Sequence, residues 1–175
     1  MTTDEAASPK LAGYVPGAIG GIVELHARHY AESHAFGMFF EAKVARDLGE
    51  FFQRYNVATD YFRTVLVDGR VEGSIAIDGG GSVKGVAHLR WFILSEALRG
   101  AGLGRQLLSE AITFCRANRY REVYLWTLGD LDTAMHLYRA FRFEIREDLE
   151  GSQWGPVVRE VRMVLPLDDN RSPGA

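Results

Sequence analysis

In the middle of the chain, an apolar strand runs directly into a glycine-rich bend and then into an amphipathic helix. The strand ends at Phe92, Ile93 and Leu94, and the helix carries apolar side chains at helical spacing as far as Cys115. The bend between them reads Arg99-Gly100-Ala101-Gly102-Leu103-Gly104-Arg105. Glycines let an anion approach the backbone, where the first free N–H groups of the helix point at it. The segment therefore predicts a diphosphate-binding site, with Arg99 and Arg105 as additional charged contacts.

The position of this bend argues against two familiar nucleotide-binding motifs. A dinucleotide-binding Gly-x-Gly-x-x-Gly motif belongs to a strand-helix-strand unit of a parallel sheet, usually near the start of a domain. Here the bend lies at mid-chain, after strands that are expected to be antiparallel. No Gly-Lys-Ser/Thr follows the glycines, so a nucleoside-triphosphate loop is excluded as well.

The apolar pattern predicts the element order β-α-α-β-β-β-α-β-α-β-β. Strands are expected at residues 11–15, 64–67, 71–77, 84–94, 122–128, 143–146 and 157–165. Helical spacing of apolar residues predicts helices at 19–30, 40–55, 103–118 and 134–141. The turn signal Asp68-Gly69 predicts a hairpin, which makes the three strands before the bend successive and antiparallel.

Length and composition indicate a single α/β domain. The chain has 175 residues, 47% of them hydrophobic, which predicts one globular domain at 11–167 between flexible tails at 1–10 and 168–175. A net charge of -3 disfavours nucleic acid and acidic membranes as partners, although it would suit a cationic acceptor. No membrane span or signal peptide is evident, and a single cysteine, Cys115, favours a reducing compartment. The predicted location is the cytoplasm.

Two motifs resemble those of the Gcn5-related N-acetyltransferase (GNAT) superfamily. The segment 99–104 fits the family signature Gln/Arg-x-x-Gly-x-Gly/Ala between a strand and a helix. Downstream, Ala134-Met135-His136-Leu137-Tyr138-Arg139-Ala140-Phe141-Arg142-Phe143-Glu144 is similar to the family segment Ala-x-x-Leu-Tyr-x-x-x-Gly-Phe-Glu. The segment from about Gly13 to Tyr55 resembles acetyltransferase domains fused to MarR-type regulators, and the length leaves no room for their DNA-binding domain.

The resemblance implies a single-domain GNAT fold, with a mixed, mostly antiparallel sheet that is flanked by helices and splayed at the cofactor site. It implies acetyl-CoA as co-substrate, with its diphosphate on Gly100 to Arg105 and its pantetheine arm paired to Phe92, Ile93 and Leu94. The splay is expected between strands 84–94 and 122–128, where a backbone N–H would stabilise the oxyanion. The implied reaction is direct transfer of an acetyl group to the primary amine of a small molecule or peptide.

Tyr138 stands at the position of the family's proton donor to the departing thiolate. A phenol has a reference pKa near 10 and a thiol one near 8.5, close enough for proton sharing. The alternative is that Tyr138 is only a core residue on the helix face with Leu137 and Phe141. A cysteine nucleophile is disfavoured, because Cys115 lies on the buried stripe of its helix.

The base that accepts the amine proton is not identified by the sequence. Candidates are His88, on a strand face expected to carry Arg90, Phe92 and Leu94 as well, and Glu24, His26 and Glu41 on the N-terminal helices. His26 and His29 share helical spacing but lack further matched ligands, so no metal is expected.

Two departures from the family pattern, two alternative functions and the oligomeric state stay open. Arg142 replaces the usual Gly, which predicts a different turn or a left-handed non-glycine residue, and Leu128-Gly129-Asp130 lacks the usual Asn. The chain could instead be a non-catalytic acyl-CoA-binding sensor or transfer a longer acyl group. Edge strands in the C-terminal half could pair in a homodimer.

Overall fold

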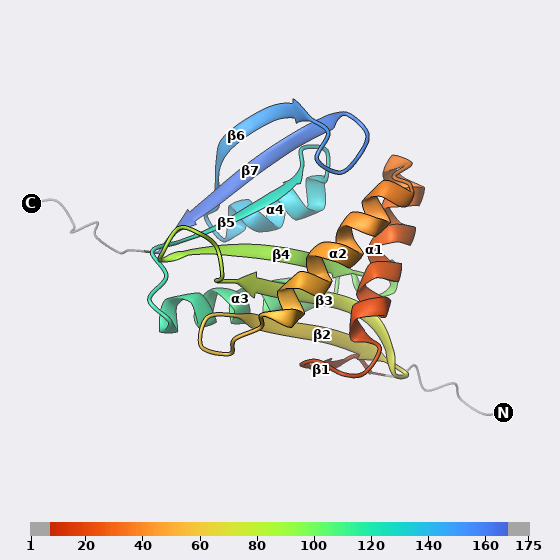
Figure 1. Ribbon diagram of the computed structural model, residues 1–175, viewed down its shortest axis with the longest axis horizontal. Coiled ribbons are helices and arrows are strands. Elements are labelled where there is room, and N and C mark those ends of the chain that lie inside the picture. The colour runs from red at the N-terminus through yellow and green to blue at the C-terminus, as the bar shows by residue number, and fades with distance from the viewer. Residues whose placement is uncertain (1–7, 168–175) are drawn as a thin grey trace, which may run out of the picture.

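Seven strands pair into one sheet in the order β1-β2-β3-β4-β5-β7-β6 (Figure 1). The computed structural model describes residues 8–167. Its strands are Lys10–Ala12 (β1), Tyr61–Val67 (β2), Arg70–Asp78 (β3), Val86–Leu94 (β4), Glu122–Leu128 (β5), Glu144–Gly151 (β6) and Val158–Pro166 (β7). All neighbouring strands are antiparallel except β4 and β5, which are parallel. The mixed, mostly antiparallel sheet is therefore confirmed.

Two helices cover each face of the sheet (Figure 1). Helices α1 (Ala18–His34) and α2 (Met38–Gln53) lie on one face, and α3 (Leu103–Ala117) and α4 (Asp132–Ala140) on the other; a 3-10 turn, η1 (Glu96–Leu98), precedes α3. Each helix buries one stripe, which for α3 consists of Leu107, Leu108, Ala111, Ile112 and Cys115. The spacing of these apolar residues explains why the predicted helices form, because each stripe packs on the sheet.

The predicted order of elements is confirmed, with differences at their ends. The Asp68-Gly69 turn joins β2 to β3 with positive φ at both residues (49° and 76°), as a two-residue hairpin turn requires. Strand β1 begins at Lys10, inside the predicted tail, and ends at Ala12 rather than Val15. Residues 8 and 9 of the predicted N-terminal tail are exposed and belong to no helix or strand, and residues 1–7 and 168–175 lie outside the described residues. None of the helices between residues 8 and 167 has the length and apolar character needed to cross a membrane.

A β-bulge interrupts β4 at Trp91. The register against β3 shifts between Ser74 and Ala76, Trp91 has a left-handed φ of 46°, and the Ser74 hydroxyl donates a hydrogen bond to the Trp91 carbonyl (2.6 Å). Trp91 packs with the α1 and α2 side of the core, whereas Phe92 packs with the α3 side. A bulge places two residues opposite one, so the alternation of faces changes there.

The bulge overturns one expectation about β4. Simple alternation placed His88 on the same face as Phe92 and Leu94, but Phe92 and Leu94 pack with Leu89 on the α3 side. The extra residue at Trp91 moves them to the opposite face from the one that alternation predicts.

Strands β4 and β5 pair only at their first residues. Their parallel register covers Val86 with Glu122, Ala87 with Val123 and His88 with Tyr124, and beyond His88 the two strands have no further paired residues. β5 continues in register with β7 as far as Leu128, and β4 continues against β3 as far as Leu94. The sheet is thus splayed between β4 and β5, as the sequence resemblance implied.

Candidate functional site

A cavity of about 190 Å³ lies where β4 and β5 separate. Its wall includes residues from α1, α2, β4, β5 and α4 and from the loop before β7. Helices from both faces of the sheet therefore meet at one cavity, because the splay removes the strand pairing that would otherwise separate them. The wall holds eight side chains of phenylalanine, tyrosine or tryptophan: Tyr30, Phe36, Phe40, Trp91, Phe92, Trp126, Tyr138 and Trp154.

Tyr138 of α4 lines this cavity and is only 5% exposed. Its ring packs near those of Phe92 and Phe143, with centroids 6.2 and 5.7 Å away. Burial, with a smaller contribution from Tyr30, raises the pKa of Tyr138 above its ordinary value. Tyr138 is therefore both a core residue and a cavity residue, and its phenol keeps its proton at neutral pH.

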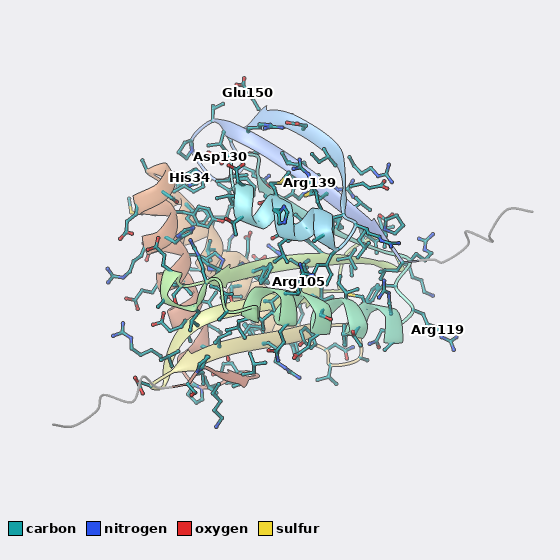
Figure 2. All side chains as sticks on the ribbon, turned by 180° about the vertical axis from the view of Figure 1, so that it is seen from behind. His34, Arg105, Arg119, Asp130, Arg139 and Glu150 are labelled. Carbon is teal, nitrogen blue, oxygen red and sulfur yellow. The ribbon has the colours of Figure 1, made fainter. Side chains whose placement is uncertain are left out.

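Near the cavity, a contact joins segments from the two faces of the sheet. His34, in the last turn of α1, donates a hydrogen bond from Nε2 to Asp130 in the loop before α4, at 3.2 Å (Figure 2). Tyr30 stacks in the same region on Phe36, with ring centroids 5.7 Å apart. These contacts fix α1 against the loop before α4 without pairing β4 with β5.

The glycine-rich bend forms the start of α3. Gly100 and Gly102 have left-handed φ values of 81° and 80°, and Gly102 is the N-cap. The N–H of Gln106 bonds the carbonyl of Gly102 (3.0 Å), so the N–H groups of Leu103, Gly104 and Arg105 precede the first intrahelical bond. Within residues 8–167, no side chain caps this terminus. Exposed N–H groups at a helix start are suited to binding an anion.

The predicted basic residues lie beside this helix start. The Arg99 guanidinium donates to the carbonyl of Leu94, the last residue of β4, at 3.2 Å. The Arg105 guanidinium lies 5.5 Å from the centre of the Phe141 ring, between α3 and α4 (Figure 2). Both side chains belong to exposed residues. The structure therefore brings the end of β4, Arg99, Arg105 and the bend together.

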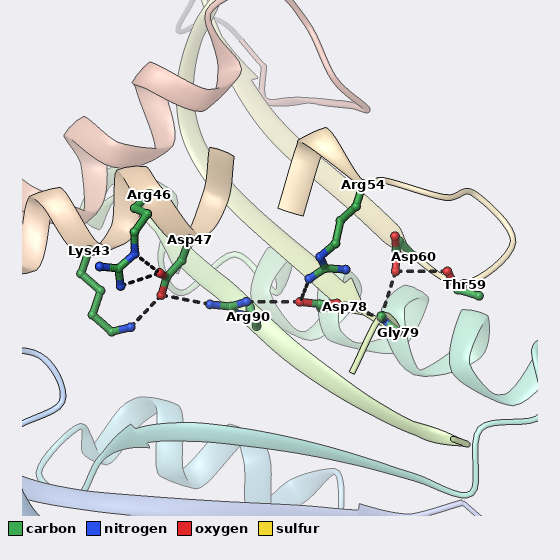
Figure 3. A network of polar contacts seen from close by, with 10 residues as sticks. Lys43, Arg46, Asp47, Arg54, Thr59, Asp60, Asp78, Gly79 and Arg90 are labelled. Carbon is green, nitrogen blue, oxygen red and sulfur yellow. Dashed lines mark hydrogen bonds and ion pairs between the residues drawn. The ribbon is translucent and has the colours of Figure 1, made fainter. Parts of the chain in front are cut away.

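A network of charged side chains reaches the cavity through Lys43, Asp47 and Arg90, and sequence reasoning missed it. Asp47 of α2 accepts hydrogen bonds from Lys43 (2.7 Å), Arg46 (2.9 Å) and Arg90 of β4 (3.3 Å). Arg90 also bonds Asp78 of β3 (3.2 Å), as Figure 3 shows. These residues are far apart in the sequence, and only the helical spacing of Lys43 and Asp47 was a visible signal of any contact.

Of the four candidate bases, the structure brings only the two histidines to the cavity. Burial lowers the pKa of His88 to about 3 and that of His26 to about 4, so both rings are neutral at physiological pH. His26 Nδ1 donates to the carbonyl of Ile22 (2.8 Å), which leaves the lone pair on Nε2. Glu24 instead pairs with Arg28 on the surface, and Glu41 is exposed and is not part of the cavity wall.

The model of the Acetyltransferase (GNAT) family matches residues 22–143, which include the bend, the splay and Tyr138. The chain belongs to the GNAT acetyltransferase family. No curated protein matched the sequence.

Solved structures of acetyltransferases share the fold at low sequence identity. An acetyltransferase from Streptococcus agalactiae has a TM-score of 0.73 and 20% identity, over 91% of this chain and 98% of that one. A ribosomal-protein-alanine N-acetyltransferase from Brucella melitensis has a TM-score of 0.71 and 15% identity, over 90% and 99%. A GNAT superfamily phosphinothricin acetyltransferase from Sinorhizobium meliloti, in complex with AcCoA, has a TM-score of 0.68 and 20% identity, over 90% and 88%.

The two departures from the GNAT pattern have different structural outcomes. Arg142 adopts a left-handed φ of 68°, the conformation for which glycine is the usual residue. The Arg142 turn thus keeps the glycine-type backbone. Gly129 donates its N–H to the carbonyl of Arg159 (2.9 Å), and a Cβ at Gly129 would lie 2.6 Å from the Arg159 side chain. In this GNAT chain, β7 therefore occupies the space beside residue 129.

The residues that the structure describes, 8–167, contain no group of three or more histidine, cysteine or acidic side chains arranged to hold a metal ion. Cys115 lies on the fully buried face of α3, and burial raises its pKa to about 12. Its thiol is therefore not part of the cavity wall and keeps its proton at neutral pH.

Proposed function

We propose that this protein transfers the acetyl group of acetyl-CoA directly to the primary amine of a small molecule or peptide. The observation that carries the proposal is the convergence of an unpaired β4 edge, an uncapped helix start and Tyr138 around the splay. Membership of the GNAT family and the fold shared with an acetyltransferase in complex with AcCoA support it.

The helix start fits a diphosphate. The N–H groups of Leu103, Gly104 and Arg105 have no intrahelical acceptor, and the helix dipole adds a positive end there. A Cβ at Gly100 or Gly102 would meet no atom within 4 Å, so the bend has open space beside it. Arg99 and Arg105 would add charge-assisted hydrogen bonds to the same phosphates, with Ala101 at the exposed tip of the bend.

The free edge of β4 fits the extended pantetheine arm. Among residues 8–167, Phe92, Ile93 and Leu94 have no strand partner on the β5 side, so their backbone groups on that side are open to a strand-like ligand. When bound, acetyl-CoA supplies the activated acetyl group and a thiolate leaving group. A backbone N–H on this stretch would stabilise the negative charge that develops on the acetyl oxygen.

Tyr138 would serve as the acid. Its raised pKa keeps the phenol protonated, and the same burial would raise the pKa of a thiol beside it, as it does for Cys115. Because burial shifts both pKa values in the same direction, the donor and the leaving group would stay close in proton affinity. Position and protonation both suit Tyr138 to donate a proton to departing sulfur.

The proton of the amine would leave by way of the cavity. His26 presents its Nε2 lone pair, but a pKa of about 4 is too low for the ring to keep a proton at neutral pH. So weak a base would hold the proton only in passing, and water that enters the cavity would be the final acceptor. The buried Cys115 gives no reason to invoke a covalent acetyl-enzyme.

The proposal also covers the location of the enzyme in the cell and its oligomeric state. A reducing, cytoplasmic location is supported by the single cysteine of the sequence. The exposed edge strand β6 is where a second copy of the chain would pair in a homodimer. No nucleic acid or membrane takes part in the proposed reaction.

The test combines ligand-induced thermal stabilisation with thiol release. Acetyl-CoA should raise the unfolding temperature, and thiol release should begin only when an amine from a mixed panel is added. Stabilisation without release for any amine would instead favour the acyl-CoA sensor. Faster release from a longer acyl-CoA than from acetyl-CoA would favour the longer-acyl transferase.

A further inference from the structure

The charged network at the cavity carries a surplus of positive charge. Its ion pairs join Lys43, Arg46, Arg54 and Arg90 to Asp47 and Asp78 (Figure 3). The buried carboxylate of Asp60 also lies near Arg54, so four cations and three carboxylates leave one unbalanced positive charge. The surplus is local, because the whole chain has a net charge of -3.

Lys43 and Arg90 are the two cations of this network that line the cavity. Their side chains are 24% and 22% exposed. Lys43 has three N–H donors and Arg90 has five. Within the described residues, Lys43 makes one recorded hydrogen bond, to Asp47, and Arg90 makes two, to Asp47 and Asp78. Both side chains therefore have donors left over for a ligand.

The cavity offers no free negative charge to a cationic ligand. Asp47 is the only carboxylate in the wall as described for residues 8–167, and three cationic side chains already bind it. Burial works against ionisation of Asp47, but hydrogen bonds from Lys43 and Arg46 outweigh it and lower the pKa, so Asp47 is ionised and occupied. A polyamine would leave its remaining ammonium groups without a partner beside Lys43 and Arg90, a repulsive arrangement.

We propose that the amine acceptor of this enzyme carries an anionic group, most simply a carboxylate, which binds Lys43 and Arg90. The inference rests on the proposed function. The aromatic wall around the same cavity suits an apolar body between the amine and the anion. A cavity of about 190 Å³ is smaller than the roughly 300 to 1,000 Å³ of drug-sized pockets. An acceptor of the size of one amino acid therefore fits better than an oligosaccharide or a folded protein.

The first experiment compares acceptors that differ only in this charge. L-Phenylalanine, L-leucine and L-methionine are each compared with their carboxamides, and spermidine and an uncharged tripeptide amide are added as other classes. The carboxamide amines are the weaker bases, so intrinsic reactivity at neutral pH favours them. The proposal predicts that kcat/KM for the best acid exceeds that for its carboxamide by about tenfold or more. Equal or better use of the carboxamides, spermidine or the tripeptide would overturn it.

The second experiment assigns the preference to the cavity wall. Lys43→Gln should lower the acid-to-carboxamide ratio of kcat/KM by about tenfold, mainly through KM, and Lys43→Arg should retain most of it. Arg46→Gln is the matched control, because Arg46 also binds Asp47 but is 63% exposed and is not part of the cavity wall. The same loss in Arg46→Gln, or no loss in Lys43→Gln, would contradict the assignment.

The design separates failure of this inference from failure of the proposed function. If no amine releases thiol, the proposed function fails, and calorimetric binding of L-phenylalanine and its carboxamide to the CoA-loaded protein still decides the charge preference. If carboxamides or spermidine are acetylated best, the proposed function holds and this inference fails. If a variant does not fold, the acid-to-carboxamide ratio of the unaltered chain decides alone.

Discussion

Tyr30 of α1 and Tyr138 of α4 line the same cavity although their helices cover opposite faces of the sheet (Figure 1). They meet because β4 and β5 have no paired residues beyond His88 and Tyr124. Tyr30 also contributes, after burial, to the raised pKa of Tyr138. The splay therefore exposes the proposed acid to a site whose other walls come from the N-terminal helices.

Removing the Tyr138 hydroxyl should slow transfer and leave cofactor binding in place. We expect Tyr138→Phe to lower kcat by one to several orders of magnitude, because a positioned acid contributes roughly 100- to 10,000-fold. The affinity for acetyl-CoA should change little, since the hydroxyl does not belong to the α3 helix start. Steady-state kinetics and calorimetric titration measure the two quantities.

The matched control for this substitution is Tyr120→Phe. Tyr120 is also buried, but its hydroxyl bonds the Thr59 carbonyl (2.7 Å) and lies outside the cavity wall. Tyr120→Phe should lower the free energy of unfolding by about 1 kcal/mol and leave kcat unchanged. Unchanged turnover in Tyr138→Phe, or an equal loss in Tyr120→Phe, would refute the role assigned to Tyr138.

The backbone of the glycine-rich bend should tolerate a side chain at one glycine and not at another. Gly102 has φ +80° with open space around it, so Gly102→Ala should destabilise the fold through backbone strain alone, by about 1 to 2 kcal/mol. A Cβ at Gly104 would make ordinary contact with Leu94 Cδ1 at 3.5 Å, so Gly104→Ala should be nearly neutral. Chemical denaturation of both variants measures the difference. Equal stabilities would show that the left-handed φ at Gly102 carries no cost.

The bend was also the part of the molecule that the sequence described best. Its glycines, the strand before it and the helix after it are all local features, so periodicity and turn chemistry were enough to predict them. The left-handed conformation of Arg142 is one of the two outcomes that the sequence predicts, because Arg142 stands where the family pattern has glycine. Such predictions succeed where neighbouring residues decide the backbone conformation.

Arg142 offers a direct gain in stability. It is exposed and has φ +68°, so Arg142→Gly should remove the cost of a left-handed non-glycine residue and stabilise the protein by up to about 1 kcal/mol. Acetyl transfer should be unchanged, since the backbone already has the conformation that glycine would adopt. A drop in the melting temperature would mean that contacts of the Arg142 side chain outweigh the backbone strain.

The buried ion pairs should make the free energy of unfolding depend on pH. Burial disfavours the charge on Asp78, but hydrogen bonds from Arg54 and the Gly80 N–H outweigh this and lower its pKa in the folded state. A carboxylate with a lowered folded pKa contributes stability above its unfolded pKa near 3.9, and loses it as pH falls through the folded value. Stability should therefore decline from about pH 4 downward.

Asp78→Asn tests this directly. At pH 7 it should cost about 2 kcal/mol, because it removes the counter-charge of Arg54 and one of the two carboxylates that bind Arg90. The difference from the unaltered chain should shrink as pH falls below 4. Asp148→Asn, at an exposed pair with Arg159, should have little effect. A difference that stays constant from pH 7 to pH 3 would exclude Asp78 as the titrating group.

The features that the sequence did not predict all depend on contacts between distant segments. The bulge at Trp91 follows from pairing with β3 and the bond from Ser74, and the alternating apolar residues before it give no sign of it. Arg90 meets Asp47 and Asp78 only after α2 and β3 have packed beside β4. In the sequence, each of these charged residues has the pattern of a solvated surface residue. The sequence therefore does not predict that positive charge gathers at the cavity wall.

The most direct test of the central claim is to measure released thiol and acetylated amine in the same reaction. With acetyl-CoA and an acceptor amine, we predict thiol release that depends on the amine and one molecule of N-acetylated product, identified by mass, for each thiol. Release without N-acetylated product, or binding of acetyl-CoA with no release for any amine tested, would contradict the claim that this protein is an N-acetyltransferase.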